Sequence, residues 1–257
     1  MTILAKKLMG VGNNLSFLLG VMIVLCSAQM AQAEDLRWTG AGNGDINNKD
    51  NWDPKKTIKG TTKYNLYFET SKITNWQNIR STAMINARGG WFLRAGTKDQ
   101  PLRFTAENSA HGVKPGGSSN YASYINMAGN AESWAVFDGG TYGPFVSYIT
   151  VGSDSYAGYL TIDSSRGVET TVSTSAYVEL NNGSIEVKGQ NSLLKANNYF
   201  AIKNNSEASV SDSGKIDLSG NLNVYDAKYS HNEATTIAKC INIAINENDE
   251  GDRKSVV

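Results

Sequence analysis

The chain has 257 residues, and its 24 basic and 24 acidic side chains give a formal charge of zero. This balance argues against partners that are recognised through net charge, so we predict no nucleic-acid partner. Gly is abundant (25) and Pro is scarce (4), and no long amphipathic helical pattern follows residue 33. This combination is typical of many short strands joined by tight turns.

Residues 1–33 have the pattern of an export signal. Lys6–Lys7 supply the positive start, Leu15–Leu25 the apolar segment, and Ala31–Ala33 a small-x-small cleavage site. We therefore expect cleavage before Glu34 and an exported protein, at the cell surface or in the extracellular space.

Two alternatives to a cleaved signal remain open. An uncleaved membrane anchor would need a longer apolar segment. A lipoprotein would be acylated at Cys26, but Leu25 is bulky for the preceding position. After cleavage Cys240 is the remaining cysteine, so no internal disulfide is expected, and we predict that this thiol fills the core.

Residues 34–62 are predicted to form an irregular N-terminal cap. Glycines and asparagines mark a loop between Trp38 and Trp52. The first coil of a repeat protein must be shielded from water and from strand addition, which the two indole rings would do. The alternative is a calcium loop, which matches the EF-hand spacing poorly; its ligands would be Asp45, Asn47, Asp50 and Asp53.

Several alternating segments follow the cap. They are Tyr64–Glu69, Ala83–Ala87, Trp91–Ala95, Leu102–Thr105 and Tyr124–Met127. Leu102 and Ile125 are 23 residues apart, a spacing that recurs later in the chain and places the start of the repeat before residue 100. The composition of Asn108–Asn120 predicts a flexible surface loop.

One strand pattern recurs through residues 133–225, with two apolar residues on one face and an outward residue between them. The copies are Ala135–Phe137, Leu160–Ile162, Ile185–Val187 and Ala208–Val210, then Val178/Leu180, Phe200/Ile202 and Leu222/Val224, with Val168, Leu193 and Ile216 between them. Such alternation predicts half-buried strands, and recurrence every 22–25 residues indicates a repeat architecture. We predict an all-β fold, a right-handed parallel β-helix (β-solenoid) spanning residues 63–246.

The last residues are expected to differ from the repeat. Thr235–Asn246 has the pattern of a further coil. Asp252–Val257 matches the translation of a common sequencing adapter, so residues 247–257 are predicted to be a non-native or disordered tail, and the gene is expected to continue.

Four segments resemble secreted autotransporter-like proteins of bacteria. They are Arg37–Asn43, Ile149–Ile162, Gly183–Val187 and Ser213–Leu222. The resemblance implies a right-handed β-helix passenger or surface stalk of a Gram-negative-type bacterium. It also implies an outer-membrane translocator or anchor encoded beyond this segment. The chain departs from the family at Ser164–Arg166 and Gln190–Asn191, where the family favours glycine.

No convergent catalytic set is apparent, and we predict no catalytic residue, metal or cofactor. His111 and His231 lack metal-ligand neighbours at suitable spacing and are expected to be solvated. Asp138, Asp163 and Lys188 lie one residue beyond the inward pairs of successive coils. Two such carboxylates on adjacent coils would be close enough to raise the pKa of one of them or to hold a cation. The alternative is strand-end residues in water, with the acids partly balanced by the lysine.

Aromatic residues form the second candidate site. Tyr142, Phe145, Tyr148, Tyr156 and Tyr159 cluster within one coil. Exposed rings would stack on glycans, whereas buried rings would pack a long turn against the solenoid.

The function predicted from these patterns is an exported, non-catalytic β-solenoid that acts as a structural or adhesin-type module, with glycans or a host surface as partners. The alternative is a carbohydrate-active β-helix enzyme, a polysaccharide lyase or glycoside hydrolase, with Asp138 and Asp163 in its site. A third interpretation is a fragment without a separate function.

Overall fold

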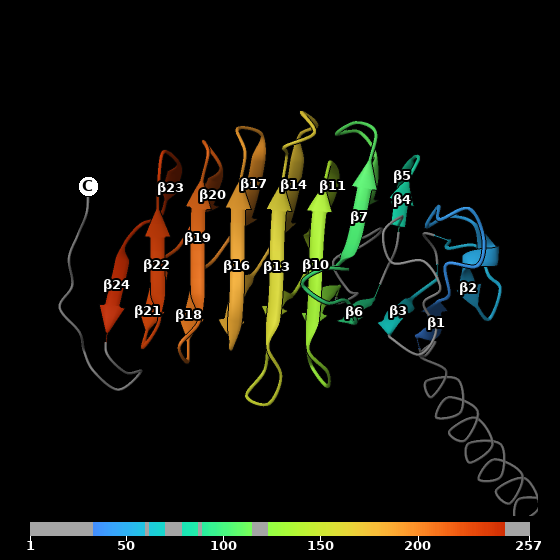
Figure 1. Cartoon of the computed structure of the whole chain (residues 1–257), viewed down its shortest axis with the longest axis horizontal. Helices are drawn as coiled ribbons and strands as arrows, with labels where there is room; N and C mark the ends of the chain where they lie inside the picture. The colour runs from blue at the N-terminus through green and yellow to red at the C-terminus, as the bar shows by residue number, and fades with distance from the viewer. Residues whose placement is uncertain (1–32, 60–61, 70–78, 87–88, 115–122, 245–257) are drawn as a thin grey trace, which may run out of the picture. The chain divides into compact units, whose positions relative to one another are not determined.

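The computed structural model describes residues 33–59, 62–69, 79–86, 89–114 and 123–244. Within them, strands wind through about six turns of a parallel β-solenoid (Figure 1). The described helical structure is one 3₁₀ turn, η1 (Lys49–Asn51). None of the described residues forms a helix that is long and apolar enough to cross a bilayer.

The strands form three sheets. In spatial order, sheet 1 contains β2 (Trp52–Asp53), β1 (Glu34–Trp38), β3 (Tyr64–Glu69), β6 (Gly90–Arg94), β9 (Tyr124–Met127), β12 (Tyr148–Val151), β15 (Tyr177–Asn181), β18 (Phe200–Lys203), β21 (Leu222–Tyr225) and β24 (Ile241–Ala244). Sheet 2 contains β4 (Ile79–Ser81), β7 (Leu102–Ala106), β10 (Ser133–Asp138), β13 (Gly158–Asp163), β16 (Gly183–Lys188), β19 (Glu207–Ser211) and β22 (Lys228–His231). Sheet 3 contains β5 (Met84–Asn86), β8 (Gly112–Lys114), β11 (Gly140–Phe145), β14 (Thr170–Thr174), β17 (Ser192–Ala196), β20 (Lys215–Leu218) and β23 (Thr235–Ile237).

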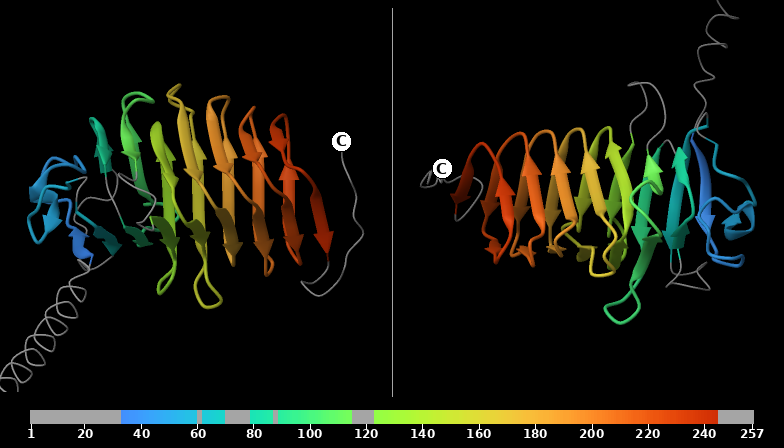
Figure 2. Two further views of the ribbon diagram at one scale, coloured as in Figure 1. Left: turned by 180° about the vertical axis from the view of Figure 1, so that it is seen from behind. Right: turned by 90° about the horizontal axis from the view of Figure 1, so that it is seen from above.

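From β3 onward each coil adds one strand to every sheet, and strands of successive coils pair parallel within each sheet. Figure 2 shows this order from two further sides. The predicted ladder of sheet 1 is confirmed, because Phe200 pairs with Val178 and with Leu222. That of sheet 2 is confirmed too: Phe137 pairs with Ile162, which in turn pairs with Val187. All three side chains are fully buried. One coil has too little interior to bury its apolar face, so burial requires the stack.

The third predicted ladder is wrong in register. Ile216 pairs with Leu194, and Leu194 pairs with Val172. Leu193 points outward and is half-buried, and Val168 precedes β14. Two adjacent leucines offer two possible faces, and period-two alternation does not choose between them.

The two tryptophans of the predicted cap are buried together against the first strands, and β1, within the predicted cap, is itself a strand of sheet 1 that pairs with β3. The rings of Trp38 and Trp52 meet edge to face, with centroids 5.1 Å apart, and both contact Phe68. The indole of Trp52 donates a 2.8 Å hydrogen bond to the carbonyl of Ile46. Strand β2 runs antiparallel to β1 and covers the outer edge of sheet 1. This arrangement protects the first strands from pairing with another chain.

Asparagines shape one corner of the solenoid. The amide of Asn204 donates a 2.6 Å hydrogen bond to Asn181, whose amide donates to Asp154. Asn182 and Asn204 have positive φ angles of 66° and 54°. Asparagine tolerates this left-handed conformation better than most residues, so it suits a tight corner.

Three local expectations are corrected. The segment expected to be a flexible loop contains β8, where Val113 is buried. Leu102 and Ile125 belong to different sheets, so their spacing of 23 residues is not a coil repeat, although the solenoid does begin before residue 100. Cys240 is only half-buried, and its thiol donates to Asn242, so it is not core.

The expected further coil is present as β23 and β24, where Ile237 and Ile243 are exposed. The predicted signal, apart from Ala33, and the predicted tail lie outside the described residues.

Candidate functional site

The two predicted carboxylates come together at the ends of neighbouring strands of sheet 2. Asp138 of β10 pairs with Asp163 of β13, and Asp163 pairs with Lys188 of β16. The expectation that both acids stand in water is wrong. Asp138 is 2% exposed and Asp163 is 8% exposed, because each lies where its strand turns into the next corner and neighbouring side chains cover it.

Two arginines approach Asp138. Nη1 of Arg103 donates a 3.1 Å hydrogen bond to Oδ2 of Asp138, and Nη1 of Arg166 lies 4.0 Å from the same oxygen. Arg103 comes from β7, where it pairs with Val136 and not with Asp138. A long side chain reaches such a diagonal neighbour. Sequence reasoning missed both arginines because it considered only the residues directly in line with the acids.

The electrostatics of this cluster follow from burial. Burial raises the pKa of Asp138 above its ordinary value; the nearby charge of Asp163 adds to the rise, and the two arginines oppose it. Oδ1 of Asp138 and the hydroxyl of Tyr142 are buried without a hydrogen-bond partner among the described residues. Burial, together with the charge of Asp138, raises the pKa of Tyr142 far above its ordinary value. That phenol therefore stays protonated.

The remaining members of the predicted column are engaged elsewhere. Asp163 accepts hydrogen bonds from the backbone amide (2.8 Å) and the hydroxyl (3.0 Å) of Ser165. Lys188 pairs with Glu186 at 3.3 Å on its own strand. The lysine therefore has an acidic partner other than the two aspartates.

This geometry favours a structural role for the cluster. A glycosidase acid must reach the glycosidic oxygen of its substrate, but only 3% of the Asp138 side chain is exposed. No three His, Cys, Asp or Glu side chains gather as a metal site within the described ranges. The arrangement that remains is a buried carboxylate held by an arginine of the preceding coil.

The alternative calcium loop is held together by its own hydrogen bonds. Oδ1 of Asp45 accepts from the amide of Asn47, and Oδ2 accepts from Thr82. Asp50 pairs with Lys55 at 3.2 Å. Asp45 and Asp50 therefore have partners within the chain, while Asp53 lies in β2.

The predicted aromatic cluster divides between the core and separate surfaces. Tyr142 is wrong as a glycan-stacking candidate because it is 1% exposed and packs against Phe137. Phe145 is equally buried. Tyr156 is exposed in a turn, and Tyr159 stacks on Trp134 on sheet 2, with centroids 3.7 Å apart.

Tyr148 lies on a different face. It projects outward from sheet 1 between Tyr124 and Tyr177, with ring centroids 4.9 and 5.7 Å away. Sequence reasoning missed these neighbours because it searched within one coil. A sequence pattern could have revealed them: a tyrosine directly precedes the first inward residue of the strand in successive coils, at Tyr124, Tyr148 and Tyr177.

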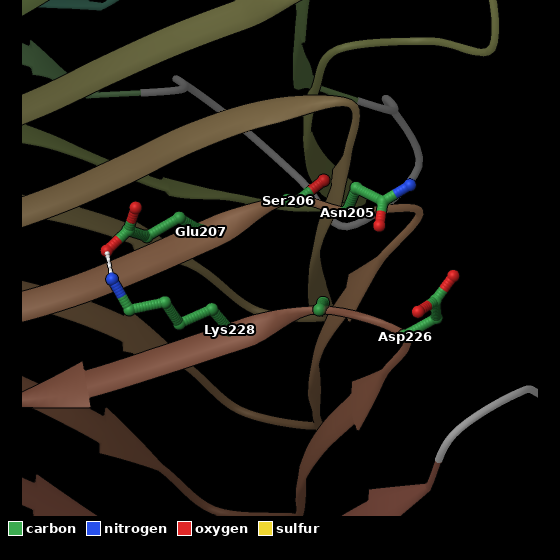
Figure 3. A pocket seen from close by; sticks show the side chains of 6 residues that line it. Asn205, Ser206, Glu207, Asp226 and Lys228 are labelled. Atoms are coloured by element: carbon green, nitrogen blue, oxygen red, sulfur yellow. Dashed lines mark hydrogen bonds and ion pairs between the residues drawn. The ribbon is translucent and has the colours of Figure 1, made fainter.

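An open pocket of about 300 Å³ lies at the corner between sheets 1 and 2 (Figure 3). Its lining residues are Asn205, Ser206, Glu207, Asp226, Ala227 and Lys228. Glu207 and Lys228 pair across neighbouring strands at 2.6 Å. The pocket wall therefore contains an exposed ion pair between neighbouring coils.

The two histidines differ from each other. His231 is exposed, as expected. His111 is half-buried, its Nε2 lies 3.4 Å from the amide of Asn108, and its Nδ1 is buried. The expectation that it is solvated is wrong.

Comparison with models of protein families, with curated proteins and with solved structures finds no match for this chain. Its identification therefore rests on architecture: the chain forms a parallel β-solenoid of about six turns.

Proposed function

We propose that this protein is an exported, non-catalytic β-solenoid that serves as a structural or adhesin-type module at the cell surface or in the extracellular space. The observation that carries the proposal is that charged side chains at the strand surfaces and ends pair with one another between neighbouring coils. They pair along the stack, from one coil to the next, as Arg103 does with Asp138 and Lys228 with Glu207. Such pairing suits a stiff support, whereas a catalytic site needs groups that converge on an accessible cleft.

Export is supported by the pattern of residues 1–33, and surface location by the resemblance to autotransporter passengers. The test is expression of the full chain in a Gram-negative host, followed by fractionation and N-terminal sequencing. The proposal expects an exported protein that begins at Glu34. A matched variant, Ala33→Arg, should block that cleavage. Uncleaved wild-type protein retained in the cytoplasm would overturn the proposed location.

A carbohydrate-active enzyme is the second candidate, and one observation favours it. Asp138 and Asp163 are adjacent, and the pKa of Asp138 is raised, as a general acid requires. Purified protein is incubated with polygalacturonate and with neutral glycans, and new chain ends are measured. The non-catalytic proposal expects none. Turnover that Asp163→Asn abolishes would establish the enzyme instead.

A further inference from the structure

A continuous row of aromatic side chains runs along the outer face of sheet 1. We call it the aromatic ladder; its members are Tyr67, Phe92, Tyr124, Tyr148, Tyr177 and Tyr199. Successive ring centroids are 4.6, 5.7, 4.9, 5.7 and 5.1 Å apart. Each member is half-buried and directly precedes an inward-facing residue. The ladder therefore crosses six successive coils in two registers. Tyr67 and Phe92 pair directly, the row then steps by two residues because Tyr124 pairs with Gly90, and it continues in one register from Tyr124 to Tyr199.

The orientation of the rings decides what the ladder presents to solvent. Four of the five contacts are stacked, with planes within 23° of parallel, so ring faces are covered by neighbouring rings. The hydroxyls of the five tyrosines donate no hydrogen bond to another described residue. Burial raises the pKa of Tyr67, Tyr124, Tyr148 and Tyr199. Those phenols therefore remain protonated at neutral pH, able to donate and to accept.

The charges beside the ladder are balanced. Arg37 and Arg94 lie over the ring of Tyr67, at 5.0 and 5.3 Å from its centroid. Both pair with Glu69, at 3.7 and 3.4 Å, and Arg37 also lies 4.0 Å from Asp35, so two acidic groups balance the two arginines. At the other end, Lys203 lies 3.9 Å from Glu179. A ligand on this surface meets no uncompensated charge, so electrostatic complementarity favours a neutral one.

We propose that the aromatic ladder binds a neutral polysaccharide, which lies along the solenoid axis and exchanges hydrogen bonds with the row of phenol hydroxyls. This inference rests on the proposed function and names its partner. Phe92 lacks a hydroxyl, but four phenol hydroxyls follow one another in a single register from Tyr124 to Tyr199. Such a row matches a polymer of equivalent hydroxylated units, and its rise of about 4.8 Å per strand is comparable to the length of one sugar ring. A peptide has no such periodic hydroxyls, and strand addition is excluded at a sheet face because the strands' backbone groups already pair within the sheet.

The test is affinity electrophoresis of the mature protein in gels that contain mannan, xylan, dextran or polygalacturonate. One variant combines Tyr124→Phe, Tyr148→Phe and Tyr177→Phe, which keeps the stacking rings and removes three hydroxyls. The matched control combines Tyr156→Phe and Tyr159→Phe, which lie off the ladder. Circular dichroism and size-exclusion chromatography check that the variants fold and elute like the wild type.

The expected result is retardation of the wild type by at least one neutral glycan. Loss of three hydrogen bonds weakens this binding by roughly ten-fold or more, and the control binds like the wild type. The inference is overturned by absence of retardation in every neutral glycan, by stronger retardation in polygalacturonate, by equal binding of the ladder variant, or by self-association through this face.

The outcomes also separate the inference from the proposed function. If the protein is exported and cleaved as proposed but binds no glycan, the proposed polysaccharide partner is wrong and the proposed structural function still stands. Shortening of the retained glycan in the same gel contradicts the non-catalytic proposal, whether or not the ladder variant binds.

Discussion

Arg103 holds Asp138 across the boundary between two coils. The guanidinium donates a 3.1 Å hydrogen bond to a carboxylate whose side chain is 3% exposed. Removing the donor leaves a buried charge with Arg166 at 4.0 Å. Arg103→Ala is therefore expected to lower the free energy of unfolding by about 1–3 kcal/mol in urea titrations.

Arg166→Ala is the matched control for this variant. Arg166 is nearly half exposed and lies farther from the carboxylate, so its loss should cost less than about 1 kcal/mol. Equal losses in the two variants would contradict the assignment of Arg103 as the principal partner.

The pH dependence of stability should reveal the buried carboxyl of Asp138. Its pKa in the folded protein lies above the ordinary value of 3.8, so above pH 3.8 the unfolded chain releases the proton first. The contribution of this group to stability is therefore complete below that pH and is lost as the pH rises through the folded pKa. The difference in unfolding free energy, wild type minus Asp138→Asn, should fall as the pH rises from 3 to 7. A difference that rises with pH would mean that the arginines overcompensate burial.

Tyr142→Phe should leave the protein as stable as the wild type, or up to about 1 kcal/mol more stable, because the phenol hydroxyl is buried without a partner among the described residues. Thermal and urea unfolding measure the change. Tyr148→Phe, on the half-buried outer ladder, serves as the control and should change stability by less than about 0.5 kcal/mol. A loss above about 1 kcal/mol in Tyr142→Phe would show that the hydroxyl is hydrogen-bonded in solution.

Two substitutions of Asn204 separate backbone strain from hydrogen bonding. The residue has φ 54° and donates to Asn181. Asn204→Ala loses the bond and strains the left-handed corner, which should cost about 1–2 kcal/mol. Asn204→Gly relieves the strain and should cost less than about 1 kcal/mol. If urea unfolding shows glycine to be as damaging as alanine, the corner conformation is not what selects asparagine.

The sequence predicts the fold well wherever alternation is unambiguous. Ile162 lies between Thr161 and Asp163, and Val187 lies between Glu186 and Lys188, so face and register follow from the polar neighbours. Leu193 and Leu194 do not provide this contrast, and there the predicted face is wrong. The right-handed winding stays a prediction from the chirality of parallel crossovers, and a crystal structure would test it.

The candidate site was less predictable because it depends on corners and diagonal contacts. Asp138 continues the strand pattern outward, but the turn and Arg103 cover it. Tyr142 follows a glycine pair whose positive φ angles turn the chain into β11, so its side chain enters the core. Neither effect can be obtained from period-two alternation alone.

Backbone proton contacts in the NMR spectrum of the mature protein test the stacked-coil architecture most directly. Thr161 pairs with Glu186, and Glu186 pairs with Ser209. Nuclear Overhauser contacts are therefore expected for both pairs, in parallel register. Contacts that join β13 antiparallel to β14, as in a sandwich of hairpins, would contradict this architecture.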